Sequence, residues 1–511
     1  MNAERSKLRA ARRVSRVALS AAAITAAGCM VGPDYEAPQT TLSAAYGESV
    51  SAPAQQTTFA VSGPAEVRWW RELGDPLLTE LVEQSLTANY SIAVAEARLR
   101  EARAARRVAQ SLLYPQVGVG ASALRFRGSE AAIDLQGLDL EDSLFQIGFD
   151  ASWAVDVFGG ARRGVESAQA IEQAVAADRR AVVLIIAAET ARAYLELRGV
   201  QRQLQIDLDI LEQQQHTLTI TEDRRRAGLA SDLEVLRARI EVEATAAEIP
   251  QLQQASRQYI HLISTLLGLE PMALSSVLER PAPVPAVPEQ IVIGIPSDLL
   301  RRRPDIQAAE RQLAAATAQV GVATAELFPQ VVLGASAGLQ SRDTDDLFNG
   351  NSSDDSSSYY LAGPVINWTL FDAGRREAGI TFAEARVDAA KAAYEEVVLG
   401  AFREVESSLV AVDRARERVG DLQRLSTSAR QSAEIARSDY ERGLLDQLTV
   451  LDAQRQSNRA DLLHSQGEVS LVVYVVTLYK ALGGGWEVAE PPPDPESVAV
   501  PGNEGAVHER Q

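Results

Sequence analysis

The 511-residue chain has a formal net charge of −19, because 69 aspartate and glutamate residues outnumber 50 lysine and arginine residues. So acidic a chain is a poor partner for nucleic acid, and we expect no nucleic-acid partner. Its single cysteine, Cys29, excludes a disulfide within the chain.

The N-terminus has the pattern of a cleavable signal peptide. Six basic residues precede an apolar, alanine-rich stretch at residues 17–27, which is too short to remain as a membrane-spanning helix. The residues before Cys29 resemble a bacterial lipoprotein box, although Ala26 stands where leucine is usual. We therefore expect cleavage after Gly28 and a lipid on Cys29. Met30, in place of aspartate, resembles the sorting signal of outer-membrane lipoproteins.

The sequence repeats itself once. Residues 92–123 and 306–337 align at a constant offset of 214, and both copies contain Pro-Gln-Val followed by Gly-Ala-Ser-Ala. The segment from Phe158 also matches the one from Phe371. Since the period is much longer than the about 20 to 50 residues of stacking repeats, we expect a duplicated domain.

One long helix is predicted in each copy. Residues 116–249 and 365–490 contain no proline and are rich in strong helix formers. Within them, residues 160–226 and 374–442 have no break stronger than an isolated glycine, so each would extend about 100 Å. Apolar positions recur at spacings of seven and four, which favours coiled-coil packing. Taken alone, these helices also fit a solvent-exposed coiled coil.

Four segments alternate between apolar and small or polar residues, as strands with one apolar face do: residues 116–126, 145–155, 330–340 and 359–369. About ten residues suffice for a tilted strand to cross a bilayer, and small polar residues on the other face suit a water-filled lumen. The fourth segment is less regular and contains Pro364, which cannot donate a ladder hydrogen bond. The alternative is an ordinary pair of hairpins packed on a core.

A sharp turn is predicted at the end of each long helix. In the first, Gly228 follows the helix, and Ser231 forms a capping box with Glu234. In the second, Gly443 follows the helix and Asp446 is a candidate N-cap. Both turns carry apolar side chains that we expect to be exposed as a contact surface: Leu229, Leu233, Leu444, Leu445 and Leu448. The alternative is an ordinary helix-turn-helix corner.

Enzyme signatures are missing from the sequence. The four histidines are scattered without the spacing of a metal site, and no metalloprotease, P-loop, nucleophile-elbow or dinucleotide pattern occurs. We therefore expect no catalytic residue, no bound metal and no cofactor.

Several motifs follow one another in an order that resembles one family: residues 29–35, Trp69-Trp70, residues 73–77, the two Pro-Gln-Val segments, and residues 371–375, 451–455 and 478–486. Over residues 29–487 the chain resembles the outer-membrane factors, or TolC-type channels, in the lipoprotein NodT/OprM-like branch that serves RND efflux pumps. The lipobox alanine, the irregular fourth strand and an acidic, proline-rich tail depart from the pattern.

The resemblance implies a mainly α-helical fold with a membrane β-barrel. Each half would supply two strands, one long helix and a pair of shorter helices stacked end to end. A homotrimer would share one 12-stranded barrel above an α-helical tunnel. It would act as an exit duct in the outer membrane of a Gram-negative bacterium, anchored by its lipid.

The partners that the resemblance implies are a periplasmic adaptor, which would contact the two turns, and an inner-membrane RND-type transporter. Drugs or other small molecules would be the cargo. The alternatives are an exit duct for type I protein secretion or metal efflux, and, in a different class, a periplasmic coiled-coil scaffold or adaptor, which would lack the four strands.

Charged residues near the turns are candidates for a periplasmic gate. Glu434 and Asp439 precede the second turn, and Arg224, Arg225 and Arg226 precede the first. Acid-to-base links between neighbouring helices there would hold the channel closed. Because exposed ion pairs contribute only about 0–1 kcal/mol each, the alternative is solvated surface charge.

The expected organisation is as follows: signal peptide 1–28; anchored N-terminal segment and equatorial wrap 29–75; first repeat 76–268 with its turn at 226–233; equatorial linker 269–303; second repeat 304–486 with its turn at 441–448; and a disordered tail, 487–511.

Overall fold

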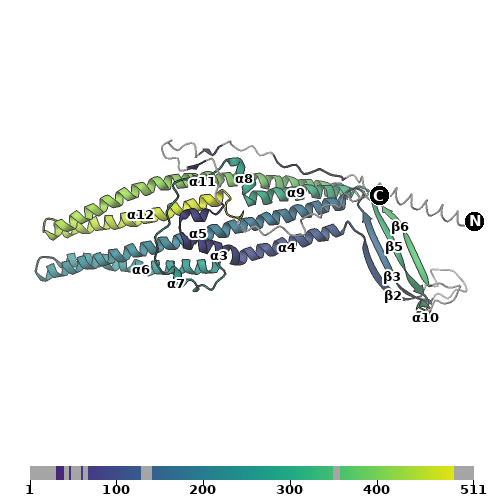
Figure 1. Ribbon diagram of the computed structural model, residues 1–511, viewed down its shortest axis with the longest axis horizontal. Coiled ribbons are helices and arrows are strands. Elements are labelled where there is room, and N and C mark those ends of the chain that lie inside the picture. Colours follow the sequence, from purple (N-terminus) through teal and green to yellow (C-terminus); the bar gives the residue numbers. More distant parts are fainter. Residues whose placement is uncertain are drawn as a thin grey trace, which may run out of the picture. The chain divides into compact units, whose positions relative to one another are not determined.

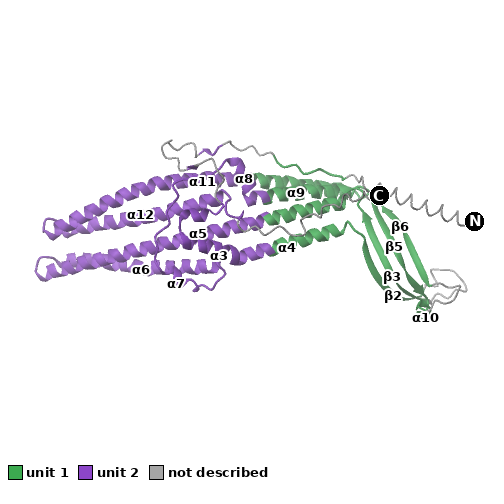
Figure 2. Cartoon of the chain, viewed as in Figure 1, with its two compact units in different colours: residues 1–40, 97–176, 308–396 green, residues 41–96, 177–307, 397–511 purple. Residues whose placement is uncertain are grey.

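The computed structural model describes residues 30–38, 45–47, 59–60, 67–127, 141–348 and 357–487. The predicted signal peptide, Cys29 and the tail after residue 487 lie outside these ranges. The chain divides into two compact units, shown in Figure 2: residues 1–40, 97–176 and 308–396 form the first, and residues 41–96, 177–307 and 397–511 the second.

The first unit contains a four-stranded antiparallel sheet in the order β2-β3-β5-β6 (Figure 1). Its strands are β2 (Gln116–Arg127), β3 (Glu141–Val155), β5 (Gln330–Ser341) and β6 (Ser358–Asn367), with the short helix α10 (Thr344–Phe348) after β5. The four predicted strands are confirmed, although β3 begins earlier and β6 ends earlier than expected. Pro364 lies in β6, an end strand of the sheet, where a missing ladder donor is tolerated.

Helices make up most of the described chain: α3 (Pro76–Ala88), α4 (Tyr90–Ser111), α5 (Gly160–Arg226), α6 (Asp232–Leu266), α7 (Ser275–Leu278), α8 (Pro296–Arg302), α9 (Pro304–Ala325), α11 (Arg375–Glu441) and α12 (Gln447–Ala481). The prediction of two long unbroken helices is confirmed, since α5 and α11 have 67 residues each. Helix α6 continues through Pro250. Within the described ranges, no helix has an apolar stretch long enough to traverse a bilayer.

Shorter helices meet end to end in the second unit, as expected. The Asn89 side-chain amide, just before α4, donates to the carbonyl of Leu266 at the end of α6, at 2.8 Å. The Arg303 guanidinium, just before α9, donates to the carbonyl of Ala481 at the end of α12, at 3.0 Å. Each junction thus satisfies a carbonyl that the helix itself leaves without a partner.

A tryptophan pair anchors the core of the second unit. Trp69 and Trp70 lie in the 3-10 helix η1 (Trp69–Leu73) and are fully buried. The Trp69 ring stacks on Tyr479 with 5.4 Å between centroids, and its Nε1 donates to the carbonyl of Gly484 at 3.2 Å. Two motifs from opposite ends of the sequence therefore pack together. The two-residue strands β1 (Phe59–Ala60) and β4 (Ile291–Val292) pair in parallel in this unit.

Candidate functional sites: sheet, N-terminal segment and hairpin tips

One face of the sheet is apolar across all four strands. The register places Val117 opposite Ala151, Ala151 opposite Ala335, and Ala335 opposite Ala362. Large side chains on this face are exposed in the described structure: Val117, Val119, Phe149, Tyr360 and Ile366. An exposed apolar band across a whole sheet indicates a surface that lies in a nonpolar environment.

The opposite face carries mostly small and polar residues, together with four exposed apolar side chains: Leu124, Phe126, Leu361 and Val365. Gly118 pairs with Asp150, and Asp150 pairs with Ser336. Further along this face, the Gln146 amide donates to the hydroxyl of Tyr359 on β6 at 2.5 Å. The predicted division into an apolar face and a polar face therefore holds over the centre of the sheet, whereas Leu361 and Val365 make β6 apolar on both faces.

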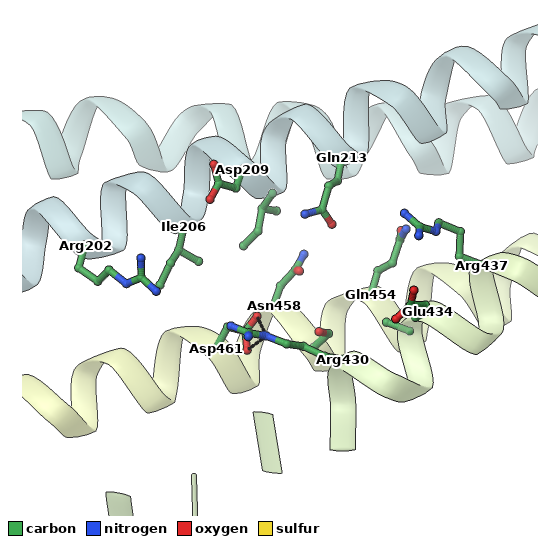
Figure 3. Close-up of a pocket in the computed structure, with 13 residues that line it drawn as sticks. Arg202, Ile206, Asp209, Gln213, Arg430, Glu434, Arg437, Gln454, Asn458 and Asp461 are labelled. Atoms are coloured by element: carbon green, nitrogen blue, oxygen red, sulfur yellow. Dashed lines mark hydrogen bonds and ion pairs between the residues drawn. The ribbon is translucent and has the colours of Figure 1, made fainter. Parts of the chain in front are cut away.

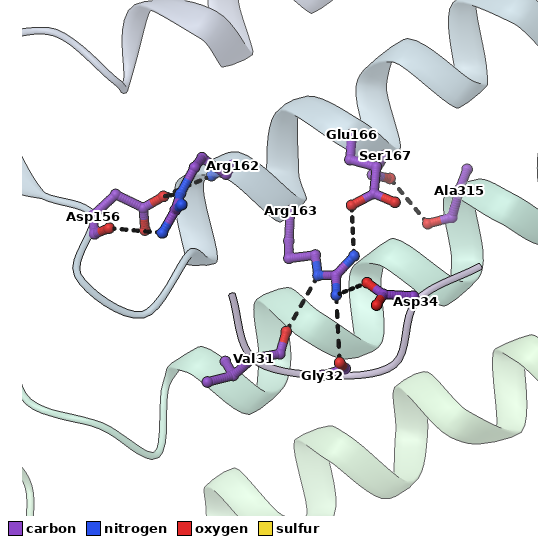
Figure 4. A network of polar contacts seen from close by, with 9 residues as sticks. All are labelled: Val31, Gly32, Asp34, Asp156, Arg162, Arg163, Glu166, Ser167 and Ala315. Atoms are coloured by element: carbon purple, nitrogen blue, oxygen red, sulfur yellow. Dashed lines mark hydrogen bonds and ion pairs between the residues drawn. The ribbon is translucent and has the colours of Figure 1, made fainter. Parts of the chain in front are cut away.

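The N-terminal segment, residues 30–38, lies in the first unit beside the turn between β3 and α5, residues 156–159, which we call the corner between β3 and α5. The Arg163 guanidinium of α5 donates to the carbonyl of Val31 at 3.2 Å and to that of Gly32 at 3.3 Å (Figure 4). The same group binds the carboxylates of Asp34 at 2.6 Å and Glu166 at 2.7 Å. Its side chain is 1% exposed, so these bonds compensate for the burial of its charge. Desolvation lowers the pKa of Arg163, but the carboxylates of Asp34 and Glu166 together raise it above its ordinary value.

Each long helix ends in a turn of the same type, and both turns lie in the second unit. Gly228 and Gly443 have positive φ angles of 75° and 77°. At both turns the amide of the glycine and the amide of the leucine after it, Leu229 or Leu444, donate to helix carbonyls at 2.8 or 2.9 Å. This is the Schellman motif, which explains why glycine stands at both positions.

The predicted caps of the returning helices are present. Ser231 and Glu234 form the capping box at the start of α6. The Asp446 carboxylate accepts from the amide of Thr449 at 2.8 Å. Hydrogen bonds from backbone amides, those of Ser231 and Thr449 respectively, lower the pKa values of Glu234 and Asp446. We call the two turns with their caps, residues 226–233 and 441–448, the hairpin tips.

Four of the five leucines predicted to be exposed at the hairpin tips are exposed: Leu229, Leu233, Leu444 and Leu448. The prediction for Leu445 is wrong. Its side chain is partly buried against a cluster that contains Tyr440 and Val450. Packing on this cluster removes apolar surface of Leu445 from water, whereas Leu444 is 68% exposed.

These features can be compared with known proteins. The family model for outer membrane efflux proteins matches residues 81–269 and 295–484. The chain belongs to the outer membrane efflux protein family. OprJ from Pseudomonas aeruginosa is 31% identical over 468 residues, which are 91% of this chain and 95% of OprJ. The pyoverdine export outer membrane protein OpmQ of the same species is 32% identical over 449 residues, 86% of this chain and 92% of OpmQ. The solved outer-membrane channel OprN has a TM-score of 0.82 at 39% identity, covering 90% of this chain and 100% of the OprN chain.

Membership in this family settles the fold class and the general function. The outer membrane efflux protein described here has the TolC-like fold, and its place is the outer membrane of a Gram-negative bacterium. It is an exit duct of a tripartite efflux system and not an enzyme.

The candidate gate residues of this efflux channel have local partners within one chain. Three of them form ion pairs close to their own turn: Arg225 with Asp232, Arg226 with Asp223, and Asp439 with Arg442. Arg224 alone reaches the other hairpin, where its guanidinium lies 4.4 Å from the ring centroid of Tyr440. The structure does not join Asp439 to Arg225 within the chain, so a latch between them would have to form between chains.

Glu434, the remaining gate candidate, lines a polar groove of about 370 Å³ in the second unit (Figure 3). The groove lies between α5 and the hairpin of α11 and α12 and also contains three arginines and two aspartates: Arg202, Arg430, Arg437, Asp209 and Asp461. The Arg430 Nε donates to both carboxylate oxygens of Asp461 at 2.9 Å. Because both signs of charge line the groove, it has no evident preference for an anion or a cation.

Gln447 is a residue at the hairpin tips that the sequence did not reveal. It is 3% exposed, and its side-chain amide donates to the hydroxyl of Thr221 at 3.0 Å and to the carbonyl of Glu234 at 3.2 Å. It therefore ties the second hairpin to the first. A glutamine in the first turn of a helix is common on protein surfaces, so its sequence position gave no signal.

Proposed function

We propose that the chain works as a lipid-anchored homotrimer, whose three sheets close one 12-stranded barrel, and that it passes small molecules from an RND-type transporter and a periplasmic adaptor to the cell exterior. The observation that carries this proposal is the sheet, which has an apolar face and two end strands without a further strand partner in the described chain. Open sheet edges are not tolerated in lipid. Four strands cannot close a barrel alone, so other copies must pair with β2 and β6.

The internal repeat supplies the register of that pairing. The pair Gln116–Ser152 between β2 and β3 recurs as Gln330–Asn367 between β5 and β6. The pair Ala151–Ala335 between β3 and β5 has no counterpart within the chain. The repeat offset is 214 residues from β2 to β5 and 215 residues from β3 to β6. Applied to this pair, these offsets place Ile366 of β6 opposite Ala121 of β2 in a second copy.

A disulfide experiment tests this register. Paired residues in antiparallel strands have Cα atoms about 4.5–5.5 Å apart, within the range of a disulfide. The double variant Ile366→Cys with Ala121→Cys should give covalent species of up to three chains under oxidising conditions. The control, Ile366→Cys with Ala123→Cys, is displaced by two residues on the same face and should link poorly. Preferential linking of the control, or a largest species of two or four chains, would refute the proposal.

Lipidation at Cys29 rests on the sequence, since this residue lies outside the described ranges. Intact-mass measurement of the mature protein should show acyl chains, and Cys29→Ser should remove them. A wild-type protein with an unmodified N-terminus would show this part of the proposal to be wrong.

The cargo class is proposed from the relatives, one of which is named for pyoverdine export. Small-molecule efflux should be restored when the chain and its cognate transporter are expressed in a strain without its own outer-membrane channels. Secretion of a protein substrate or metal export, without efflux of small organic compounds, would favour the alternative ducts instead.

A further inference from the structure

We infer that the corner between β3 and α5 is a docking site for the start of the mature chain, and that Arg163 is the positioning residue that fixes the lipid anchor beside the sheet. This inference rests on the proposed lipidation of Cys29. It assigns a role to the N-terminal segment, residues 30–38, which lies against the first unit along α5 and α9.

The Arg163 side chain binds this segment mainly through the backbone of the segment. The guanidinium binds the carbonyls of Val31 and Gly32, and the Val31 amide donates to the carbonyl of Phe158 at 3.1 Å. Asp34 adds the side-chain carboxylate. Four hydrogen bonds thus join Val31, Gly32 and Asp34 to one corner. Removal of the segment would leave the Arg163 guanidinium with Glu166 as its remaining partner among these contacts.

Two glycines allow the close approach. Gly32 has a φ of +87°, and a methyl group added to it would collide with the backbone of Gly321 on α9. A methyl group on Gly321 would collide with the side chain of Arg163. At the offset of 214 residues, the first repeat has Arg107 where the second has Gly321. The second repeat therefore has its small residue at the point where the segment crosses.

The corner of the second repeat binds its equivalent arginine in a different way. Arg376 occupies the position equivalent to Arg163, but it binds its own corner. It donates to the carboxylate of Asp372 at 2.6 Å and to the carbonyl of Glu326 at 3.1 Å. The position equivalent to Asp372 is Gly159, where a methyl group would collide with Met30. In the first corner, space for the N-terminal segment takes the place of that carboxylate, and Arg163 binds the segment in addition to Glu166.

The segment is held at both Met30 and Tyr35. Met30 lies against Gly159 at the corner, while the hydroxyl of Tyr35 donates to Glu310 at 3.1 Å on α9. Consecutive Cα atoms are about 3.8 Å apart, so an acyl group attached at position 29 would be kept near the end of β3. The anchor and the apolar face of the sheet would then enter the membrane at the same place.

The first test measures docking directly. Hydrogen–deuterium exchange of the full-length protein in detergent should show about tenfold faster exchange at the Val31 amide in Arg163→Ala, because the backbone of the segment is released. Arg163→Lys, which cannot form the same set of bonds, should show an intermediate increase. The matched control Arg376→Ala should leave this amide unchanged. Unchanged protection in Arg163→Ala would overturn the inference.

The second test separates positioning of the anchor from general stability. The yield of heat-resistant oligomer in outer-membrane fractions should fall in Arg163→Ala and in Asp34→Ala when Cys29 is present. In the Cys29→Ser background the same substitutions should have little further effect, because there is no anchor to position. Equal losses in both backgrounds would show that Arg163 has only a structural role. If wild-type Cys29 proves to be unmodified, the exchange experiment still reports whether the segment docks, so the two failures are distinguishable.

Discussion

Trp153 and Trp368 make the same hydrogen bond from equivalent positions of the two repeats. The indole Nε1 of Trp153 donates to the carbonyl of Leu113 at 3.0 Å, and that of Trp368 donates to the carbonyl of Leu327 at 3.1 Å. Each bond joins the end of the second strand of a repeat to the segment before its first strand. Tryptophan is favoured at the interface between membrane and water, where its ring is in an apolar region and its N–H meets a polar group.

We expect Trp153→Phe and Trp368→Phe to destabilise the protein to a similar extent. Each substitution keeps an aromatic ring and removes one hydrogen bond, whose net contribution is about 0.5–1.5 kcal/mol. The thermal dissociation midpoint of the oligomer in detergent should fall in both variants, and further in the double variant. If the midpoint fell in only one of the two single variants, the two tryptophan hydrogen bonds would not contribute equally to stability.

The hairpin tips should be required for efflux but not for assembly. Leu229→Asp together with Leu444→Asp should abolish efflux, because a carboxylate buried in an apolar contact with an adaptor has no compensating partner. Drug accumulation assays should detect the loss, while heat-resistant oligomers still form. The milder Leu229→Ala with Leu444→Ala should retain part of the activity. Undiminished efflux in the aspartate variant would show that the adaptor binds elsewhere.

The cap at Asp446 should stabilise the start of α12 in a pH-dependent way. Its folded-state pKa is lowered by the hydrogen bond from Thr449, so the stabilisation is present above the ordinary pKa of aspartate, about 3.9, and is lost as the pH falls through the lowered folded-state value. Amide exchange at residues 447–449 should be the same at pH 7 and pH 5 after correction for intrinsic rates. Asp446→Ala should accelerate it at both values, whereas Asp446→Asn should not. A wild-type change between pH 7 and pH 5 would contradict this assignment.

A gate between chains would be detected electrically. Asp439→Ala together with Arg225→Ala should raise single-channel conductance in planar bilayers, if links between neighbouring chains hold the tips closed. Within one chain these residues bind Arg442 and Asp232, so Arg442→Ala with Asp232→Ala is the matched control for lost local pairs. Wild-type conductance in the first variant, or an equal increase in the control, would place the latch elsewhere.

Local chemistry made part of this structure predictable. Gly228 and Asp446 were identified because a positive φ angle and a helix cap each depend on a few neighbouring residues. The strands were identified because the apolar period of two also determines which face is apolar. Arg163 was not identified, because it stands beside Arg162 in the sequence. Its burial depends on parts of the chain more than a hundred residues away, namely the N-terminal segment and helix α9. Gln447 was missed for the same reason, since its partner Thr221 belongs to the other repeat.

The most direct test of the account is the number of chains in the purified channel. Native mass spectrometry of detergent-extracted wild-type protein should give a complex of three chains. This result follows if β6 of each copy pairs with β2 of the next and no sheet edge remains open in lipid. A single chain that stays in solution after removal of the detergent would contradict the account.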